Sequence, residues 1–566
     1  MNARIDNLYF EAGGPTRIPA AASVTGVSDP APLKIGSIAT LAFLSSRLST
    51  ERIASNIAES LHWETAGAVL LLHLSSSASA LPLANWPGIA PTLNGVFGFA
   101  GQTTQDPRGF DRLDLSLGSN PDEHVFLEPL LDHVRRHYRH VLLWVGVGAA
   151  RKVQIASLSH GNPSFVLFRN DPNNLGNLRL LQAELGAHSK VARRVRYVLC
   201  LEEQEHAHEL ERALLVPALA TGLEYNARPA ISPDNFRFLR CADGAFESHT
   251  RSLAREVAQR RVGLALSSGG AKGLAHIGVI QVLEEHGIDV DVVTGCSMGS
   301  YVASIWAHGH DGTVLEKLAR EVKGRWGLWK LIDPVLPPRQ GFVHGNAVIA
   351  RLKRTIGEAH FTDLFRPLRV VATNLETLER EVFAGGEVAQ AVHASSAIPG
   401  VCVPVRIGCE TYIDGGIADP LPVDILEEMG VERIIAVNTI PTPAHMRHNR
   451  ELMRARDRME ARGLGLGAFL NERVNYFARG NILDNLLRSV HGAQMRVAEQ
   501  ASRHAHVVLR PLAIDPHWHE FSKPDKYISL GRRAAEEHLD EILELMNRKE
   551  TSHDHAMAQE KMAIVA

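Results

Sequence analysis

Cysteine, long apolar runs and an excess of charge of one sign are all scarce in this sequence. Five cysteines among 566 residues, with no CxxC pair, exclude a disulfide framework and provide no zinc motif. No apolar run approaches the ~20 residues that a membrane-spanning helix needs. Sixty Lys and Arg against 63 Asp and Glu give a net charge of −3, which argues against a nucleic-acid partner.

The first residues lack the apolar core of a secretory signal, because Met1–Gly14 contains Asp6 and Glu11. We therefore expect a cytoplasmic protein, with peripheral contact on the inner membrane face as a further expectation. No cofactor and no metal is expected, and the sequence leaves the oligomeric state open. One stretch has a histidine spacing that metals can use, but its arginines would repel a cation, so we predict a solvated basic helix there: His133, His137 and His140.

The composition that is present, 45% hydrophobic and 22% charged, is typical of a soluble globular protein, and the length predicts several domains. Hydrophobic patterning divides the chain into six segments. We predict a flexible N-terminal segment (1–33), an N-terminal α/β domain (34–225), a linker (226–260), a second α/β domain (261–438), a helical C-terminal extension completing the second domain (439–550) and a flexible tail (551–566).

In the N-terminal domain, short apolar runs alternate with helical patterns, which predicts a parallel sheet covered on both faces. The predicted strands are Ile38–Leu44, Ala68–Leu74, Val141–Val147, Ser164–Phe168 and Tyr197–Leu201. The loop Ser45–Ser49 before a helix at Thr50–Leu61 lacks the glycines and lysine of a P-loop. The layout is similar to degenerate relatives of the deviant Walker-type partitioning ATPases, which implies a Rossmann-like, degenerate P-loop-like domain with a scaffold or regulatory role.

Two strand–turn–helix units begin the second domain. Val262–Leu266 is a predicted strand, followed by the glycine-rich loop Ser267–Gly273 and a helix at Leu274–His286. Glycines there let backbone N–H groups converge on negative charge at a helix N-terminus. The next predicted strand, Val290–Thr294, leads into Gly295-Cys296-Ser297-Met298-Gly299, a G-x-S-x-G in the setting that a nucleophile elbow requires.

A carboxylate follows 414 − 297 = 117 residues later, in Tyr412-Ile413-Asp414-Gly415-Gly416. Asp-Gly alone is a common turn. The three motifs in this order, however, resemble the patatin-like phospholipase family, whose signature is a glycine-rich loop, G-x-S-x-G and D-G-G/A. The resemblance covers Arg261 to Asn438, and connecting segments such as Ala394–Gly400 share it. Within the family the chain is most similar to the neuropathy-target-esterase branch.

This resemblance implies a three-layer α/β/α domain and a Ser-Asp dyad, with Ser297 as nucleophile and Asp414 as base. It further implies that amides around Gly269 and Gly270 form the oxyanion hole beside Lys272. The remaining motif glycines are Gly273, Gly295, Gly299, Gly415 and Gly416. Ser268 stands where the family has the first of three consecutive glycines. If that position needed positive φ, a serine there would cost about 1 kcal/mol.

The implied function is hydrolysis of carboxylic ester bonds of phospholipids or lysophospholipids in lipid catabolism, through an acyl-enzyme. An acyltransferase that uses the same acyl-enzyme and a non-catalytic lipid-binding scaffold are the alternatives. A Ser–Asp–His triad is a rival mechanism, with candidates at His445, His448, His491, His504, His506, His517 and His519. Two segments, Arg325–Ile332 and Gly463–Phe477, mix apolar side chains with nearby cations, as membrane-surface segments do.

Overall fold

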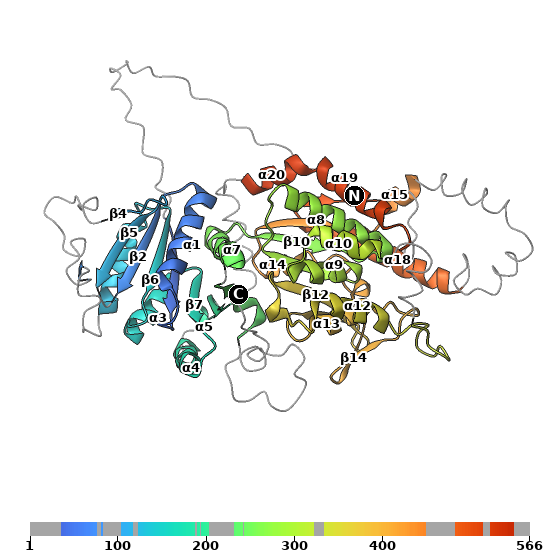
Figure 1. Cartoon of the computed structure of the whole chain (residues 1–566), viewed down its shortest axis with the longest axis horizontal. Coiled ribbons are helices and arrows are strands. Elements are labelled where there is room, and N and C mark those ends of the chain that lie inside the picture. The colour runs from blue at the N-terminus through green and yellow to red at the C-terminus, as the bar shows by residue number, and fades with distance from the viewer. Residues whose placement is uncertain are drawn as a thin grey trace, which may run out of the picture.

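Two β-sheets organise the chain, one in each half (Figure 1). The computed structural model describes residues 36–75, 81–82, 103–116, 123–186, 189–192, 194–202, 231–241, 243–321, 333–448, 482–512 and 521–547. None of the helices in these ranges has the length and apolar character that crossing a membrane would require. The two segments with predicted membrane-surface character lie outside the described residues.

The first sheet is doubly wound around a central strand. Its order is β3-β5-β2-β6-β1-β7-β8-β9, with β4 added beside β5, and every pairing except β4–β5 is parallel. The strands are β1 (Ser37–Phe43), β2 (Val69–Ser75), β3 (Leu81–Pro82), β4 (Thr104–Gln105), β5 (Asp111–Ser116), β6 (His140–Val145), β7 (Ser164–Phe168), β8 (Val195–Leu201) and β9 (Phe236–Arg240). The chain leaves β1 toward both edges, which is the arrangement of a Rossmann-like sheet.

Alternate residues of these strands fill cores on opposite faces of the sheet. Leu71 packs with α1 (Thr50–Thr65) and α7 (Asp243–Ala258), whereas Leu70 and Leu72 pack with α2 (Leu127–Val134). The other helical elements of this half are η2 (Glu123–Phe126), α3 (Arg151–His160), α4 (Pro172–Gly186), α5 (Ser189–Ala192) and η3 (Pro233–Asn235). Helices on both faces explain why the strands are nearly continuous apolar runs.

The structure corrects the predicted linker over 226–260 at the residues that it describes there, 231–241 and 243–260. Residues 236–240 form β9, which pairs with β8, and α7 packs against α1 and lies between the two sheets (Figure 1). Phe246, Leu253 and Val257 of α7 are buried in the first core. Two prolines and weak periodicity in 226–240 suggested a connection, but this short edge strand takes its conformation from pairing with β8.

The second sheet has the order β14-β15-β12-β11-β10-β16-β17, with β13 also paired to β12. Strands β12, β11, β10, β16 and β17 are parallel, and β13, β14 and β15 pair antiparallel. The strands are β10 (Val262–Leu266), β11 (Val292–Cys296), β12 (Leu368–Asn374), β13 (Arg380–Phe383), β14 (Val405–Ile407), β15 (Glu410–Asp414), β16 (Arg433–Val437) and β17 (Val507–Leu509).

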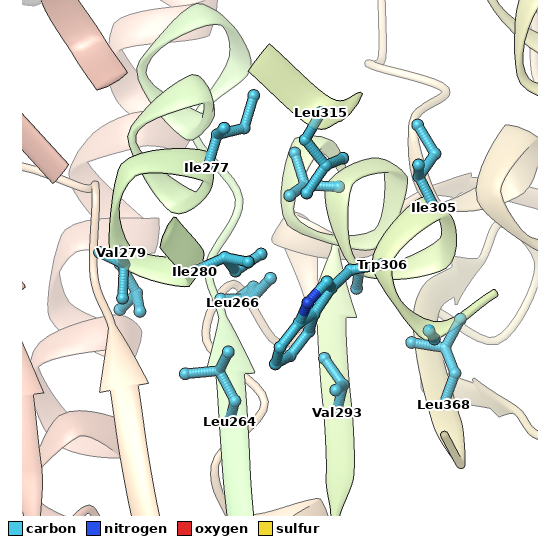
Figure 2. Close-up of a cluster of buried hydrophobic side chains, with 14 of the residues drawn as sticks. Leu264, Leu266, Ile277, Val279, Ile280, Val293, Ile305, Trp306, Leu315 and Leu368 are labelled. Atoms are coloured by element: carbon cyan, nitrogen blue, oxygen red, sulfur yellow. The ribbon is translucent and has the colours of Figure 1, made fainter. Parts of the chain in front are cut away.

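Helices cover this sheet and bury its largest core. They are η4 (Gly270–Leu274), α8 (Ala275–Glu285), α9 (Met298–Ala307), α10 (Gly312–Arg320), α12 (Asn346–Ile356), η5 (Phe361–Asp363), α13 (Val388–Ser395), η6 (Gly415–Ile417), α14 (Asp424–Glu428), α15 (Pro443–His448), α18 (Ile482–Ala501), η7 (Ser502–His504), α19 (Pro524–Glu537) and α20 (Leu539–Asn547). Figure 2 shows Leu264 and Val293 of the strands facing Ile280 of α8 and Trp306 of α9. This packing fixes the loops that follow β10 and β11.

The C-terminal extension was predicted to be helical, but it also contributes a strand. This strand, β17, continues the sheet beside β16. Its helix α19 crosses α8 at glycine contacts: a Cβ on Gly278 would lie 2.0 Å from the carbonyl oxygen of Ile528, and one on Gly531 would lie 1.9 Å from that of Ala275. Ile528 and Tyr527 of α19 belong to the main core of this domain. The extension is therefore packed into the domain that carries the site.

Candidate active site

Ser297 occupies a sharp turn between β11 and α9, with φ 54° and ψ −120°. A non-glycine residue rarely adopts positive φ, so the surrounding contacts must hold this conformation. A Cβ on Gly299 would lie 2.3 Å from the carbonyl oxygen of Leu266, so only glycine lets α9 approach β10 this closely. This is the geometry predicted for a nucleophile elbow.

Asp414 ends strand β15, and the strand register brings it beside the elbow. Cys296 pairs with Val371, and Asp414 pairs with Ala372, the next residue of β12. The end of β11 and the end of β15 therefore lie at nearly the same height on either side of β12. The side chains of Ser297 and Asp414 can reach each other across β12. Ser297 Oγ donates a hydrogen bond of 2.6 Å to Asp414 Oδ2.

The carboxylate of Asp414 is held by its own turn. Its Oδ1 accepts the backbone N–H of Gly416 at 2.8 Å, and its backbone carbonyl accepts the Thr373 hydroxyl at 3.1 Å. Burial raises the pKa of Asp414 to about 6, and the hydrogen bonds from Ser297 and Gly416 act in the opposite direction. In the part of the chain that the structure describes, no histidine ring bonds Ser297 or Asp414.

The histidines proposed for a triad have other surroundings. His504 pairs with Glu427, His506 accepts the N–H of Ile434, and His491 lies near Lys272. His445 and His448 belong to α15, and residues 517 and 519 lie outside the described residues. The geometry thus favours direct contact between serine and carboxylate over a histidine relay.

The glycine loop lies between β10 and α8, at the carboxyl edge where β10 and β11 are neighbours. Gly270 has φ +56°, which glycine adopts without strain, whereas Ser268 is not among the positive-φ residues, so serine costs nothing there. Within the described residues, neither the Gly269 nor the Gly270 N–H has a protein acceptor. Within this part of the chain, both N–H groups therefore keep their hydrogen-bonding capacity.

The remaining motif glycines sit where elements touch. An added Cβ would lie 2.5 Å from Met298 at Gly273, 2.7 Å from the backbone of Ser300 at Gly295, 2.2 Å from the carbonyl of Val371 at Gly415 and 2.7 Å from the Gln494 amide at Gly416. The last contact shows that α18, which reaches η6, brings Gln494 to the D-G-G turn. Sequence reasoning gave Gln494 no role.

Lys272 is buried in η4, and its burial lowers its pKa to about 8. Burial is the main cause that lowers the pKa of His491, a residue of α18, to about 4. The nearby positive charge of Lys272 acts on the pKa of His491 in the same direction. Lys272 thus belongs to the glycine-rich loop itself, and α18 brings His491 near it.

Three buried polar residues at the site were given no role by the sequence analysis. Ser395 Oγ accepts the backbone N–H of Ser297 at 2.8 Å, His276 Nε2 contacts the Ser267 carbonyl at 2.9 Å, and Thr439 Oγ1 donates to the Ser268 carbonyl at 3.0 Å. Ser395 belongs to the segment Ala394–Gly400, which carries part of the family resemblance. No local pattern singles out Thr439.

The histidine stretch of the first domain does not form the expected helix. His133 is in the last turn of α2, and His140 opens β6, where its Nδ1 contacts Ser37 Oγ at 2.7 Å. Among the residues that the structure describes, no group of three or more His, Cys, Asp or Glu side chains is placed to hold a metal ion.

Comparisons with known proteins identify the domain that carries this site. Residues 264–427 match the patatin-like phospholipase family model. Lysophospholipase nte1 of Aspergillus fumigatus is 32% identical over 201 residues, which cover 35% of this chain and 13% of that protein. The chain thus spans only about an eighth of the length of this curated relative.

Two solved structures are similar at low sequence identity. A plasmid partition protein of Borrelia burgdorferi is 11% identical, with a TM-score of 0.29, covering 40% of this chain and 99% of that one. VipD of Legionella pneumophila is 15% identical, with a TM-score of 0.26, covering 51% of this chain and 66% of that one. The family match covers both the elbow and the D-G-G turn. The chain therefore contains a patatin-like phospholipase domain, which is similar to that of the NTE1 lysophospholipases.

Proposed function

We propose that this chain hydrolyses carboxylic ester bonds of phospholipids or lysophospholipids, with Ser297 as nucleophile and Asp414 as base. The observation that carries the proposal is the 2.6 Å hydrogen bond from Ser297 Oγ to Asp414 Oδ2 at a strained elbow. The patatin-like domain and its similarity to proteins named lysophospholipases support the substrate class.

The first step forms an acyl-enzyme. As Ser297 Oγ attacks the ester carbonyl carbon, its proton passes to Asp414 and the carbonyl π electrons move onto oxygen. An aspartate whose pKa is raised to about 6 is a stronger base than an exposed one, yet it is still ionised at neutral pH. The Gly269 and Gly270 N–H groups stabilise the oxyanion, a contribution worth roughly 10²–10³-fold in rate per donor.

Collapse of the tetrahedral intermediate completes the transfer. The C–O bond to the alcohol breaks, Asp414 returns its proton to that oxygen, and the alcohol or lysolipid leaves. Water then attacks the acyl-Ser297 ester, giving its proton to Asp414, and the second collapse releases the fatty acid and restores the serine. In both steps the same carboxylate, that of Asp414, accepts the proton and returns it.

The test is an activity screen of wild type, Ser297→Ala and Asp414→Asn across phospholipids, lysophospholipids and triacylglycerols. We expect wild type to release fatty acid from the phosphate-bearing lipids and both variants to be inactive while folded. Retained turnover in either purified variant rejects the dyad. Fluorophosphonate labelling of wild type but not of Ser297→Ala locates the nucleophile, and failure to label wild type favours the lipid-binding scaffold.

The same acyl-enzyme could transfer its acyl group to an alcohol. Adding glycerol or a lysolipid as acceptor to the assay distinguishes the two outcomes, because hydrolysis releases free fatty acid whereas transfer yields a new ester. We propose hydrolysis as the main reaction, as the names of the relatives indicate.

We further propose that the protein is cytoplasmic with peripheral membrane contact, and that its N-terminal domain is a scaffold or regulatory module. The loop between β1 and α1 has no glycine and no lysine to hold a phosphate. Weak, salt-sensitive co-sedimentation with anionic vesicles is expected, and its absence at low salt contradicts the membrane contact. ATP turnover by the chain would contradict the scaffold role.

A further inference from the structure

The peptide that precedes Gly269 is held from outside the family-matched segment. The carbonyl oxygen of Ser268 accepts the Thr439 hydroxyl at 3.0 Å and the Ser267 hydroxyl at 3.0 Å. The Thr439 N–H in turn donates to Ser267 Oγ at 2.9 Å. Thr439 is buried and follows β16, beyond residues 264–427.

The two hydrogen bonds to the Ser268 carbonyl also fix the direction of the Gly269 N–H. A trans peptide is planar, so its C=O and N–H point in opposite directions. When Thr439 and Ser267 hold the Ser268 carbonyl on one side, the Gly269 N–H must point away from them. Thr439 also packs against the α-carbon, because a Cβ on Gly269 would lie 2.2 Å from Thr439 Oγ1.

The neighbouring peptides are restrained in the same way. His276 Nε2 contacts the Ser267 carbonyl at 2.9 Å, and the Lys272 N–H donates to the Gly269 carbonyl at 3.3 Å. The second bond directs the Gly270 N–H away from Lys272. Among the described residues the Gly269 and Gly270 N–H groups have no acceptor, although the carbonyl side of the peptide before each is occupied.

We propose that Thr439 is a positioning residue for the oxyanion hole: its hydroxyl holds the Ser268 carbonyl so that the Gly269 N–H is aimed at the developing oxyanion. The inference rests on the proposed esterase function and extends it to a residue outside the matched family segment. The effect should appear in the transition state and the tetrahedral intermediate and not in substrate binding, because the carbonyl oxygen gains its negative charge only after Ser297 attacks.

The test compares Thr439→Val, which keeps the branched shape and loses the hydroxyl, with Thr439→Ser, which restores it. The matched control is Thr40→Val, which removes a buried hydroxyl that donates to the Ser157 carbonyl at 2.7 Å in the other sheet. The full-length variants are assayed for kcat and KM with a lysophospholipid, alongside wild type and Ser297→Ala.

A second readout isolates the oxyanion. A fatty trifluoromethyl ketone accepts Ser297 Oγ at its carbonyl carbon, Asp414 takes the hydroxyl proton, and the adduct carries an oxyanion. An ether analogue of the same lysolipid has no such carbon and measures binding alone. Affinity for both inhibitors is measured for every variant.

We expect Thr439→Val to lower kcat roughly 10- to 100-fold with KM nearly unchanged, and to weaken the ketone by a similar factor but not the ether. Thr439→Ser and Thr40→Val should stay within about 3-fold of wild type. Equal kcat in Thr439→Val and wild type overturns the inference, as does a loss of ether affinity that matches the loss of ketone affinity. A wild type with no Ser297-dependent turnover overturns the proposed function as well.

Should Thr439→Val fail to fold, Ser267→Ala provides a second measurement, because it removes both the other hydroxyl on the Ser268 carbonyl and the acceptor of the Thr439 N–H. We expect a smaller fall in kcat, again with the ketone weakened and the ether unaffected. Unchanged ketone affinity in folded Ser267→Ala overturns the inference.

Discussion

The backbone N–H of Ser297 donates to Ser395 Oγ at 2.8 Å, across 98 residues of sequence. On the other side of the same residue, Ser300 Oγ donates to the Ser297 carbonyl at 2.6 Å. Two serine hydroxyls therefore hold the backbone of a residue whose φ is +54°. Because it already has an acceptor, the Ser297 N–H is not free to bind an oxyanion, which agrees with our proposal that the glycine loop supplies donors.

Ser395→Ala should weaken both the fold and the reaction. The change leaves the buried Ser297 N–H without an acceptor, which costs about 1–3 kcal/mol of unfolding free energy, and it lets the strained elbow relax. We expect kcat to fall about 10-fold or more, since a small displacement of Oγ breaks its alignment with Asp414. Urea unfolding and steady-state kinetics measure the two effects.

The control for that variant is Ser304→Ala, another buried serine, whose hydroxyl donates to the Tyr301 carbonyl at 2.8 Å within α9. We expect it to keep kcat near the wild-type value. If both alanine variants lose activity equally, general loss of stability rather than elbow alignment explains the result.

Activity should fall in acid as the base becomes protonated. Burial raises the pKa of Asp414 to about 6, so kcat/KM should drop tenfold per pH unit below about 6 and level off above it. Burial also raises the pKa of Asp419 to about 6, and Arg380 bonds that carboxylate at 3.1 Å. Asp419→Asn is thus the control: if its profile loses the acid limb, the limb does not belong to Asp414.

Replacing the proposed base should make the folded protein more stable at neutral pH. The pKa of Asp414 lies above its ordinary value of 3.8, so the folded state binds the proton more tightly than the unfolded state. Stability therefore falls as pH rises from about 4 to about 6, and the deficit persists above that window. Asp414→Asn removes this deficit, and we expect its denaturant midpoint to exceed that of wild type at pH 8. A lower midpoint at pH 8 would show that its hydrogen bonds outweigh the burial of charge.

Strands with two covered faces could be predicted because the apolar run is set by burial alone. Ser164–Phe168 coincides with β7, and Val262–Leu266 coincides with β10. Short or edge strands escaped prediction, since β9, β14 and β17 take their conformation from a partner distant in sequence. Such pairing depends on tertiary context more than on local composition.

Some residues of the site could likewise be predicted from the sequence, and others could not. Ser297, Asp414 and the motif glycines could be named because tight turns and close approaches restrict which residue fits. Ser395 and Thr439 could not, because a buried hydroxyl that accepts or donates one hydrogen bond leaves no local pattern. Their roles emerge only when α13 and the end of β16 reach the elbow and the glycine loop.

A further prediction concerns the contact between the two halves of the chain. Arg255 of α7 bonds Glu64 of α1 at 2.9 Å, and on the other side it bonds Asp289 at 3.2 Å and Asp291 at 3.2 Å. Asp291 is buried, and its other oxygen accepts the Val262 N–H at 2.8 Å. The guanidinium therefore joins the first helix of one sheet to the starts of β10 and β11 in the other.

Arg255→Met should cost about 3–5 kcal/mol of unfolding free energy, because it leaves the buried Asp291 carboxylate without the arginine that bonds it directly. Burial already raises the pKa of Asp291 while Arg255 opposes the rise, so the variant should bind a proton there more readily. Its deficit relative to wild type is expected to shrink as pH falls, which urea unfolding at pH 8 and pH 5 measures.

Two further variants decide what Arg255 contributes. Arg251→Met removes a more exposed arginine that pairs with Asp289 at 2.8 Å, and we expect it to cost at most about 1 kcal/mol. Adding Asp291→Asn to Arg255→Met removes the stranded charge and should recover part of the lost stability. If the double variant is no more stable than Arg255→Met, or if Arg251→Met is equally damaging, then the loss does not come from a buried carboxylate that has lost its ion pair.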